Sequence, residues 1–381
     1  MTRRLSRWSR SMDSGEKIAK RSNALARPLI ALGIETSCDD TCAAIVTSDR
    51  QILSEVLRTQ HHLHEPMGGI VPKLAHHAHM RHLPEVVREA IQKAGLGVQE
   101  IDIVAVTRGP GLAHSLGVGL NAAKTLAAAL NKPLVGVHHM EAHALTARLT
   151  TRDPEEKDGD ESNRLSGPRR LGSKPYPSFP FLTLLVSGGH TLLLVAHSVN
   201  RYTTLANTVD DSIGEAFDKT ARELDIPWLP GRAGGPGASL EEFAKRSQNP
   251  DRYLHRLPIP MSLRTNKREM KFSFAGLKSA VTRIVNQEKA ASPLGVMDVR
   301  DKQDLAAGFQ HCAVTHLCQK VEQGLLDCRR QSIHITGLVI SGGVGRNATL
   351  RRYQQGLVDS YDIDIVPKWP LDMLGTGIVP E

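Results

Sequence analysis

Two histidines four residues apart, with a glutamate between them, stand in the stretch LVGVHHMEAHALTARL at residues 134–149. The β-branched run at the start of this stretch predicts a strand, and the apolar spacing after it predicts a helix. On a helix, His139 and His143 would share one face and could direct two imidazoles at one metal ion. The spacing therefore makes this pair a candidate metal site.

A zinc-protease helix also carries two histidines, but its glutamate directly follows the first and serves as general base. Glu141 comes two positions after His139, about 200° around a helix of 3.6 residues per turn, and so faces away from the ion. The spacing disfavours a peptidase. A pair of ordinary solvated histidines at a helix start remains the alternative. Seven of the 17 histidines crowd into residues 61–82, which we interpret as a polar, partly helical surface and not as a second metal site.

The chain has 381 residues, enough for two or three domains, and it is 40% hydrophobic with few aromatic residues. No apolar run approaches the ~18 residues that span a bilayer, so we expect no membrane-spanning segment. The cysteines form no C-x-x-C pair, which indicates a reducing compartment without a disulfide framework. They are Cys38, Cys42, Cys312, Cys318 and Cys328.

Most of the net charge of +8 belongs to residues 1–30, which hold eight basic and two acidic residues. This Arg- and Ser-rich leader without an apolar core is typical of a mitochondrial targeting segment, with a plain basic tail as the alternative. Total charge therefore cannot argue for nucleic acid. Local basic groups could contact phosphates, or could form an ordinary charged helix face. They are Arg252, Arg256, Arg264, Lys267, Arg268, Lys271, Lys278, Arg346, Arg351 and Arg352.

Three Gly/Ser turns each follow an apolar run, at residues 29–49, 181–197 and 335–353. The first two predict strand–turn–strand openings, and the third predicts a strand, a glycine turn and a helix that begins near Asn347. Such turns offer backbone N–H groups to phosphate. Two similar openings about 150 residues apart predict an α/β protein with two actin-like lobes. We expect a leader at 1–30, a first lobe at 31–149, a polar insertion at 150–180 and a second lobe at 181–381.

A series of motifs in this order closely resembles the tRNA N6-adenosine threonylcarbamoyltransferase family, also called O-sialoglycoprotein endopeptidase-like. The forms of ETSCDDT and HHMEAH resemble the bacterial and organellar branch of the family, and the basic leader then points to its mitochondrial member. The resemblance covers roughly residues 30–355. The motifs are GIETSCDDT, GGIVPKLA, TRGPGLAHSLGVGLNAAKTLA, HHMEAHAL, LLVSGGHT, DDSIGEAFDKTAREL, FSFAGLKSAV and SGGVGRN.

The resemblance implies an enzyme that transfers a threonylcarbamoyl group from threonylcarbamoyl-adenylate to N6 of adenosine 37, in mitochondrial tRNAs that read codons beginning with A. It implies an interlobe cleft, a donor made by a separate synthase, a possible homodimer and a location in the matrix. It places one divalent metal, iron or zinc, on His139 and His143. The donor-binding positions that it implies are Leu185, Val186, Ser187, Gly188, Gly189, Asp218, Gly235 and Asn347.

The C-terminus departs from the family pattern. The family follows its third glycine turn with a Cys-Thr-Asp-Asn motif, whose aspartate is the third metal ligand, and then with a closing helix. This chain ends IVPKWPLDMLGTGIVPE, where Asp372 is a poor match in its context. We therefore expect an altered or truncated end that lacks the closing helix. An actin-fold small-molecule kinase and a catalytically impaired binding subunit remain the alternative functions.

Overall fold

The computed structural model describes residues 27–67, 69–150, 176–228, 235–262, 268–360 and 367–368. Most of the expected leader, most of the insertion and Asp372 lie outside these residues. The chain divides into two compact units, and the boundary falls within helix α5, between Ala142 and His143. In the part that is described, we find no helix long and apolar enough to cross a membrane.

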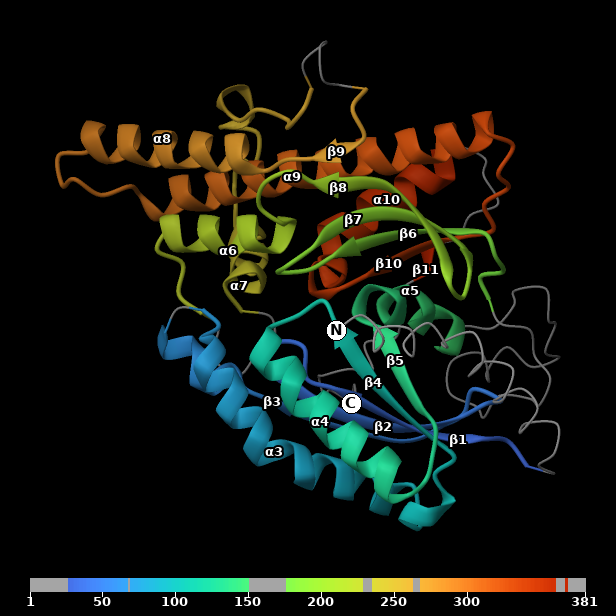
Figure 1. Cartoon of the computed structure of the whole chain (residues 1–381). Helices are drawn as coiled ribbons and strands as arrows, with labels where there is room; N and C mark the ends of the chain where they lie inside the picture. The colour runs from blue at the N-terminus through green and yellow to red at the C-terminus, as the bar shows by residue number, and fades with distance from the viewer. Residues whose placement is uncertain are drawn as a thin grey trace, which may run out of the picture. The chain divides into compact units, whose positions relative to one another are not determined.

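Unit 1 is built on a five-stranded sheet in the order β3-β2-β1-β4-β5. Strands β1 to β3 pair antiparallel, whereas β1, β4 and β5 pair parallel, so their carboxyl ends meet at one edge. Helices α3 and α4 pack on each other and on this sheet (Figure 1). The elements are β1 (Ile30–Glu35), β2 (Asp40–Thr47), β3 (Ile52–Thr59), α2 (His61–His64), α3 (Pro72–Lys93), β4 (Ile103–Gly109), α4 (Ala113–Ala129), β5 (Leu134–His138) and α5 (His139–Thr150).

Unit 2 has a six-stranded sheet in the order β11-β10-β6-β7-β8-β9. Its strands β8-β7-β6-β10-β11 correspond in order to β3-β2-β1-β4-β5 of unit 1, and β9 is an additional edge strand. Strands β6, β7 and β8 pair antiparallel, while β10 joins β6 in parallel. The elements are β6 (Phe181–Val186), β7 (Thr191–Ser198), β8 (Arg201–Thr208), α6 (Ile213–Glu223), α7 (Gly235–Ala244), β9 (Lys271–Phe272), α8 (Ala275–Ala291), α9 (Val299–Arg330), β10 (Leu338–Ser341), α10 (Ala348–Ser360) and β11 (Pro367–Lys368). Both predicted strand–turn–strand openings are present, as β1–β2 and β6–β7.

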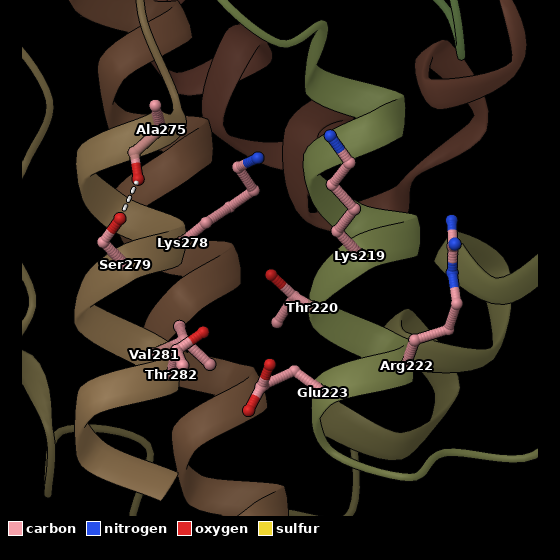
Figure 2. Close-up of a pocket in the computed structure, with 9 residues that line it drawn as sticks. All are labelled: Lys219, Thr220, Arg222, Glu223, Ala275, Lys278, Ser279, Val281 and Thr282. Atoms are coloured by element: carbon pink, nitrogen blue, oxygen red, sulfur yellow. Dashed lines mark hydrogen bonds between the residues drawn. The ribbon is translucent and has the colours of Figure 1, made fainter. Parts of the chain in front are cut away.

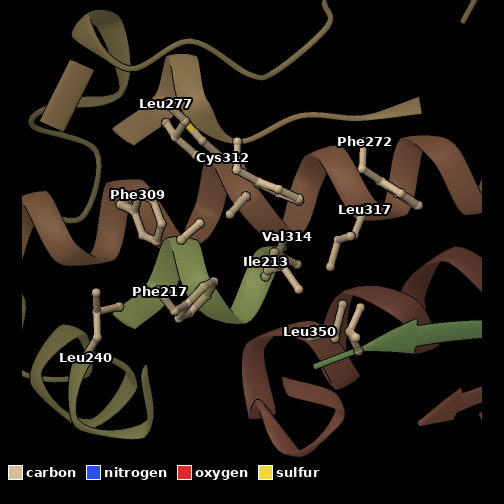
Figure 3. Close-up of a cluster of buried hydrophobic side chains, with 14 of the residues drawn as sticks. Ile213, Phe217, Leu240, Phe272, Leu277, Phe309, Cys312, Val314, Leu317 and Leu350 are labelled. Atoms are coloured by element: carbon tan, nitrogen blue, oxygen red, sulfur yellow. The ribbon is translucent and has the colours of Figure 1, made fainter. Parts of the chain in front are cut away.

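The core of unit 2 is assembled around α9, which packs against α7, α8 and α10. Phe217 of α6 meets Phe309 of α9 edge to face, with ring centroids 5.3 Å apart (Figure 3). Unit 1 has a smaller core of aliphatic side chains between its sheet and helices α3 and α4. Each unit thus has a hydrophobic core of its own.

His316 of α9 is a fully buried imidazole at the edge of the unit 2 core. It packs edge to face against Phe272 and Phe274. Burial, and then the charge of Lys320, lower its pKa to about 4. The neutral ring therefore stabilises the fold above the ordinary histidine pKa of 6.5, and this contribution is lost as pH falls toward 4.

Replacing His316 with leucine should reduce the fall of the unfolding free energy as the pH is lowered. Between pH 7 and pH 5, the wild-type unfolding free energy should fall by about 2 kcal/mol more than that of His316→Leu. Urea unfolding of unit 2 at both pH values measures this difference. The exposed His255, replaced by leucine, should keep the wild-type slope. Parallel pH profiles for wild type and His316→Leu would contradict a neutral buried imidazole.

Candidate functional site

The carboxyl edge of the parallel strands in unit 1 brings together three polar side chains. Glu35 ends β1, Thr107 lies near the end of β4, and His139 follows β5 directly. The Thr107 hydroxyl donates to Glu35 Oε2, and His139 Nδ1 lies 3.2 Å from the same oxygen. The Ser37 N–H donates to Glu35 Oε1. Strand order therefore joins residues that are 104 positions apart in sequence.

Glu35 is held as a carboxylate. Burial by itself would raise its pKa, but hydrogen bonding and charge from His139, with hydrogen bonds from Thr107 and Ser37, outweigh burial and lower the pKa to about 2. A carboxylate only accepts hydrogen bonds, so the His139 proton facing it must be on Nδ1. In this tautomer, a metal would be bound through Nε2, as when a carboxylate orients a metal-ligating histidine.

His143 lies one turn further along α5, on the unit 2 side of the boundary. Its Nδ1 is 3.2 Å from the hydroxyl of Ser341, which ends β10. Ala147 of the same helix is buried with Phe181 and Val339 and so fixes this part of α5 on the sheet. His139 and His143 are thus one turn apart on a single helix, and each has its Nδ1 next to an oxygen of its own unit.

The donor-binding positions expected from the family begin at the end of β6. Leu185 and Val186 are buried in that strand, and Ser187, Gly188 and Gly189 form the tight turn to β7. The Ser187 N–H donates to the carbonyl of His190 at 2.9 Å. No atom lies within 4 Å of where a Cβ would stand on Gly188 or Gly189, so a ligand can approach this backbone.

The glycine turn after β10 and the N-terminus of α6 both lie against the Ser187–Gly189 turn. Ser341 is paired with Leu185 in the parallel β6–β10 ladder, which places Gly342 beside Val186. The Gly214 N–H, in the first turn of α6, donates to the Ser187 carbonyl at 3.2 Å. Carboxyl ends of parallel strands beside a helix N-terminus are where α/β folds bind phosphate-bearing ligands. The structure therefore gathers Ser187, Gly214, Ser341 and His143 within unit 2.

Asp218 and Gly235 lie close together further along unit 2. Asp218 Oδ1 accepts the N–H of Gly237 at 2.8 Å, which fixes the first turn of α7, and burial raises the pKa of this carboxyl. Gly235 starts α7 at a φ of +61°, which favours glycine. Asn347 is buried and caps α10: its Oδ1 accepts from the Leu350 N–H, and its amide donates to Gln310. Asn347 therefore has a structural role at the position expected to contact donor.

A groove of about 660 Å³ lies between α6 and α8. Figure 2 shows the amino groups of Lys219 and Lys278 turned toward each other, while Arg222 points away. Both lysines pair with the carboxylate of Asp211. Because one acid already bridges the two cations, we assign this groove no substrate.

Four of the basic residues considered for RNA contact form ion pairs within the protein, and one of them is Lys278, described above. Arg252 pairs with Asp301, and Arg256 pairs with Glu288 at 2.7 Å. Lys271 pairs with Glu269 at 3.0 Å. Arg264 and Lys267 lie outside the described residues. These pairs favour the alternative of a charged helix surface.

Glu35 is the functional candidate that the sequence did not single out. Replacing it with glutamine should weaken metal binding about ten- to a hundredfold, because an amide holds the His139 tautomer less firmly. Competition with a chromogenic chelator measures the affinity. The exposed Glu65, replaced by glutamine, should leave it unchanged. Equal affinities for wild type and Glu35→Gln would remove Glu35 from the site.

Comparison with known proteins identifies the family of this chain. The family model for tRNA N6-adenosine threonylcarbamoyltransferase matches residues 51–157 and 168–367. A probable mitochondrial tRNA N6-adenosine threonylcarbamoyltransferase of Arabidopsis thaliana is 39% identical over 92% of this chain and 67% of its own length. The tRNA N6-adenosine threonylcarbamoyltransferase of Rhizobium meliloti is 40% identical over 87% of this chain and 82% of its own.

Among solved structures, full-length HypF in its phosphate- and nucleotide-bound form matches with a TM-score of 0.50. It shares 12% sequence identity, over 92% of this chain and 54% of that chain. This likeness concerns the fold alone. With the strand order that the two sheets share over five strands, it confirms the predicted actin-like fold class.

Proposed function

The chain belongs to the tRNA N6-adenosine threonylcarbamoyltransferase family, and from this premise we propose the reaction, its substrate and its place in the cell. The chain transfers the threonylcarbamoyl group of threonylcarbamoyl-adenylate to N6 of adenosine 37, in mitochondrial tRNAs that read codons beginning with A. A relative named mitochondrial supports the location, which we place in the matrix. A separate synthase supplies the donor.

The observation that carries this proposal is the pair of imidazoles on α5, one oriented by Glu35 and the other beside Ser341 at the glycine turns. A divalent metal on His139 and His143 would polarise the carbamoyl oxygen of the donor and stabilise developing negative charge. We propose iron or zinc as this metal.

The protein residues position the two reactants. We assign the adenylate phosphate to the open backbone of Gly188 and Gly189, near the N-terminus of α6. N6 of the adenosine attacks the carbamoyl carbon, the bond from that carbon to the phosphate oxygen breaks, and AMP leaves with the bonding electrons. N6 loses a proton to solvent. Asp218 holds α7 in place rather than reacting, because its Oδ1 is bonded to Gly237.

The test is rescue of a mitochondrial tRNA modification. Full-length chain, expressed in a yeast strain that lacks its own mitochondrial enzyme, should restore threonylcarbamoyl-adenosine, measured by mass spectrometry of nucleosides. Purified chain given labelled donor should transfer the label to tRNA and release AMP. Phosphate transfer to a small acceptor would instead identify a kinase. Binding of tRNA without transfer would identify a non-catalytic subunit.

A further inference from the structure

We propose that Asp39, Asp40 and His61 form a separate site for a divalent cation of the Mn²⁺ type. Among the described residues, these three form a group whose possible ligand atoms all lie within 4.8 Å of one another. Two ligands on opposite sides of such an ion are separated by about 4 to 5 Å. The site uses neither His139 nor His143, and it does not depend on the proposed transfer reaction.

The strand register of unit 1 brings the three residues together. Asp40 begins β2 and is paired with Thr59 near the end of the antiparallel strand β3. His61 follows two positions later, at the start of α2, and its N–H donates to the Thr59 hydroxyl at 3.3 Å. Asp39 precedes β2 in the turn from β1. The arrangement therefore follows from the sheet and does not require long flexible loops.

A buried imidazole fixes the turn between β1 and β2 through hydrogen bonds. His79 of α3 has no exposed surface. Its Nε2 donates to the Cys38 carbonyl at 2.9 Å, since a carbonyl only accepts, and its Nδ1 then accepts from the Thr41 hydroxyl at 2.8 Å. These contacts bracket Asp39 and Asp40. Gln60, also fully buried, donates to the same Nδ1 at 3.3 Å and precedes His61 directly. One ring thus positions the neighbours of all three ligands.

One carboxylate oxygen of this group, Asp40 Oδ1, is buried without a hydrogen-bond partner among the described residues. A carboxylate oxygen in this state is costly unless a cation or donor compensates it. Asp39 adds a second like charge next to it. A bound cation would satisfy the oxygen and neutralise the pair.

The ligand types select the kind of ion. Two carboxylates favour Mg²⁺, Ca²⁺ and Mn²⁺, whereas an imidazole favours later transition metals. Mn²⁺ binds both carboxylates and imidazoles, and water would fill its remaining octahedral positions. The exposed Cys38 precedes Asp39 but is not part of this group.

The experiment uses full-length protein carrying His139→Ala and His143→Ala, so that the histidine pair cannot contribute. After removal of metals, MnCl₂ is titrated and free Mn²⁺ is followed by electron paramagnetic resonance. We expect one Mn²⁺ per chain. Adding Asp40→Asn or His61→Gln should weaken binding at least tenfold. His62→Gln, which changes the exposed neighbour of His61, should leave the affinity unchanged.

Thermal unfolding provides a second test, in which Asp40→Asn is expected to raise stability without metal although it weakens metal binding. In EDTA, Asp40→Asn should unfold at a higher temperature than its parent, because the isosteric amide removes like-charge repulsion. Mn²⁺ should raise the unfolding temperature of the parent but not that of Asp40→Asn. The proposal is overturned if no Mn²⁺ binds below 1 mM, or if Asp40→Asn and His61→Gln bind it as the parent does. Circular dichroism verifies folding of each variant.

Discussion

Replacing His139 with alanine is expected to remove most of the iron or zinc bound on α5 and to lower transfer to tRNA by about a thousandfold, on the order of 4 kcal/mol in the barrier. The imidazole is oriented by Glu35 and Ser37, so no neighbouring side chain can take its place at the same geometry. Metal content by inductively coupled plasma mass spectrometry and modified nucleoside by mass spectrometry measure both effects.

The adjacent His138 provides the matched control. Its Nδ1 accepts the Met140 N–H at 3.3 Å, a weak bond at the start of α5. His138→Ala should therefore cost no more than about 1 kcal/mol of stability and should keep wild-type metal content. If His139→Ala retained both metal and transfer, the metal assignment on α5 would be wrong, whatever the fold.

The elements around the site could be predicted from local sequence patterns. The β-branched run before His139 and the apolar spacing after it correspond to β5 and α5. The Gly/Ser turns mark the ends of β1, β6 and β10. Such features depend on residues close in sequence, which is why periodicity detects them.

The contacts between distant residues could not be predicted in this way. Glu35 contacts His139 because the sheet places β1, β4 and β5 side by side, so that their carboxyl ends meet. No short sequence motif encodes this strand order. We interpret the histidines at 61–82 as a polar surface without a second metal site, and this interpretation is wrong for the two that are buried. His64 and His79 are buried, because Gln60, Thr41 and the Cys38 carbonyl satisfy their ring nitrogens. The cation site that we propose at His61 also departs from it.

Replacing Gly342 with alanine should destabilise unit 2 by about 3 kcal/mol or more and abolish donor binding. Gly342 has a φ of +98° and a ψ of 164°, a region that residues with a Cβ rarely occupy. A Cβ there would also overlap the Val186 carbonyl and stand 3.3 Å from the Ser187 Cβ. The substitution would push the β10 turn away from the end of β6 and so disturb the adjacent turn at Gly188 and Gly189, to which we assign the adenylate phosphate. Urea unfolding and calorimetric titration with AMP measure the two effects.

Gly343 is the control because both its surroundings and its backbone conformation accept a methyl group. No atom lies within 4 Å of its Cβ position, and its φ is not in the left-handed region. Gly343→Ala should therefore change the unfolding free energy by about 0.5 kcal/mol at most. Equal destabilisation by both substitutions would indicate that any methyl group disrupts this turn. An effect at Gly342 but not at Gly343 would support the conclusion that close packing of the β10 turn against the end of β6 determines the shape of the donor site.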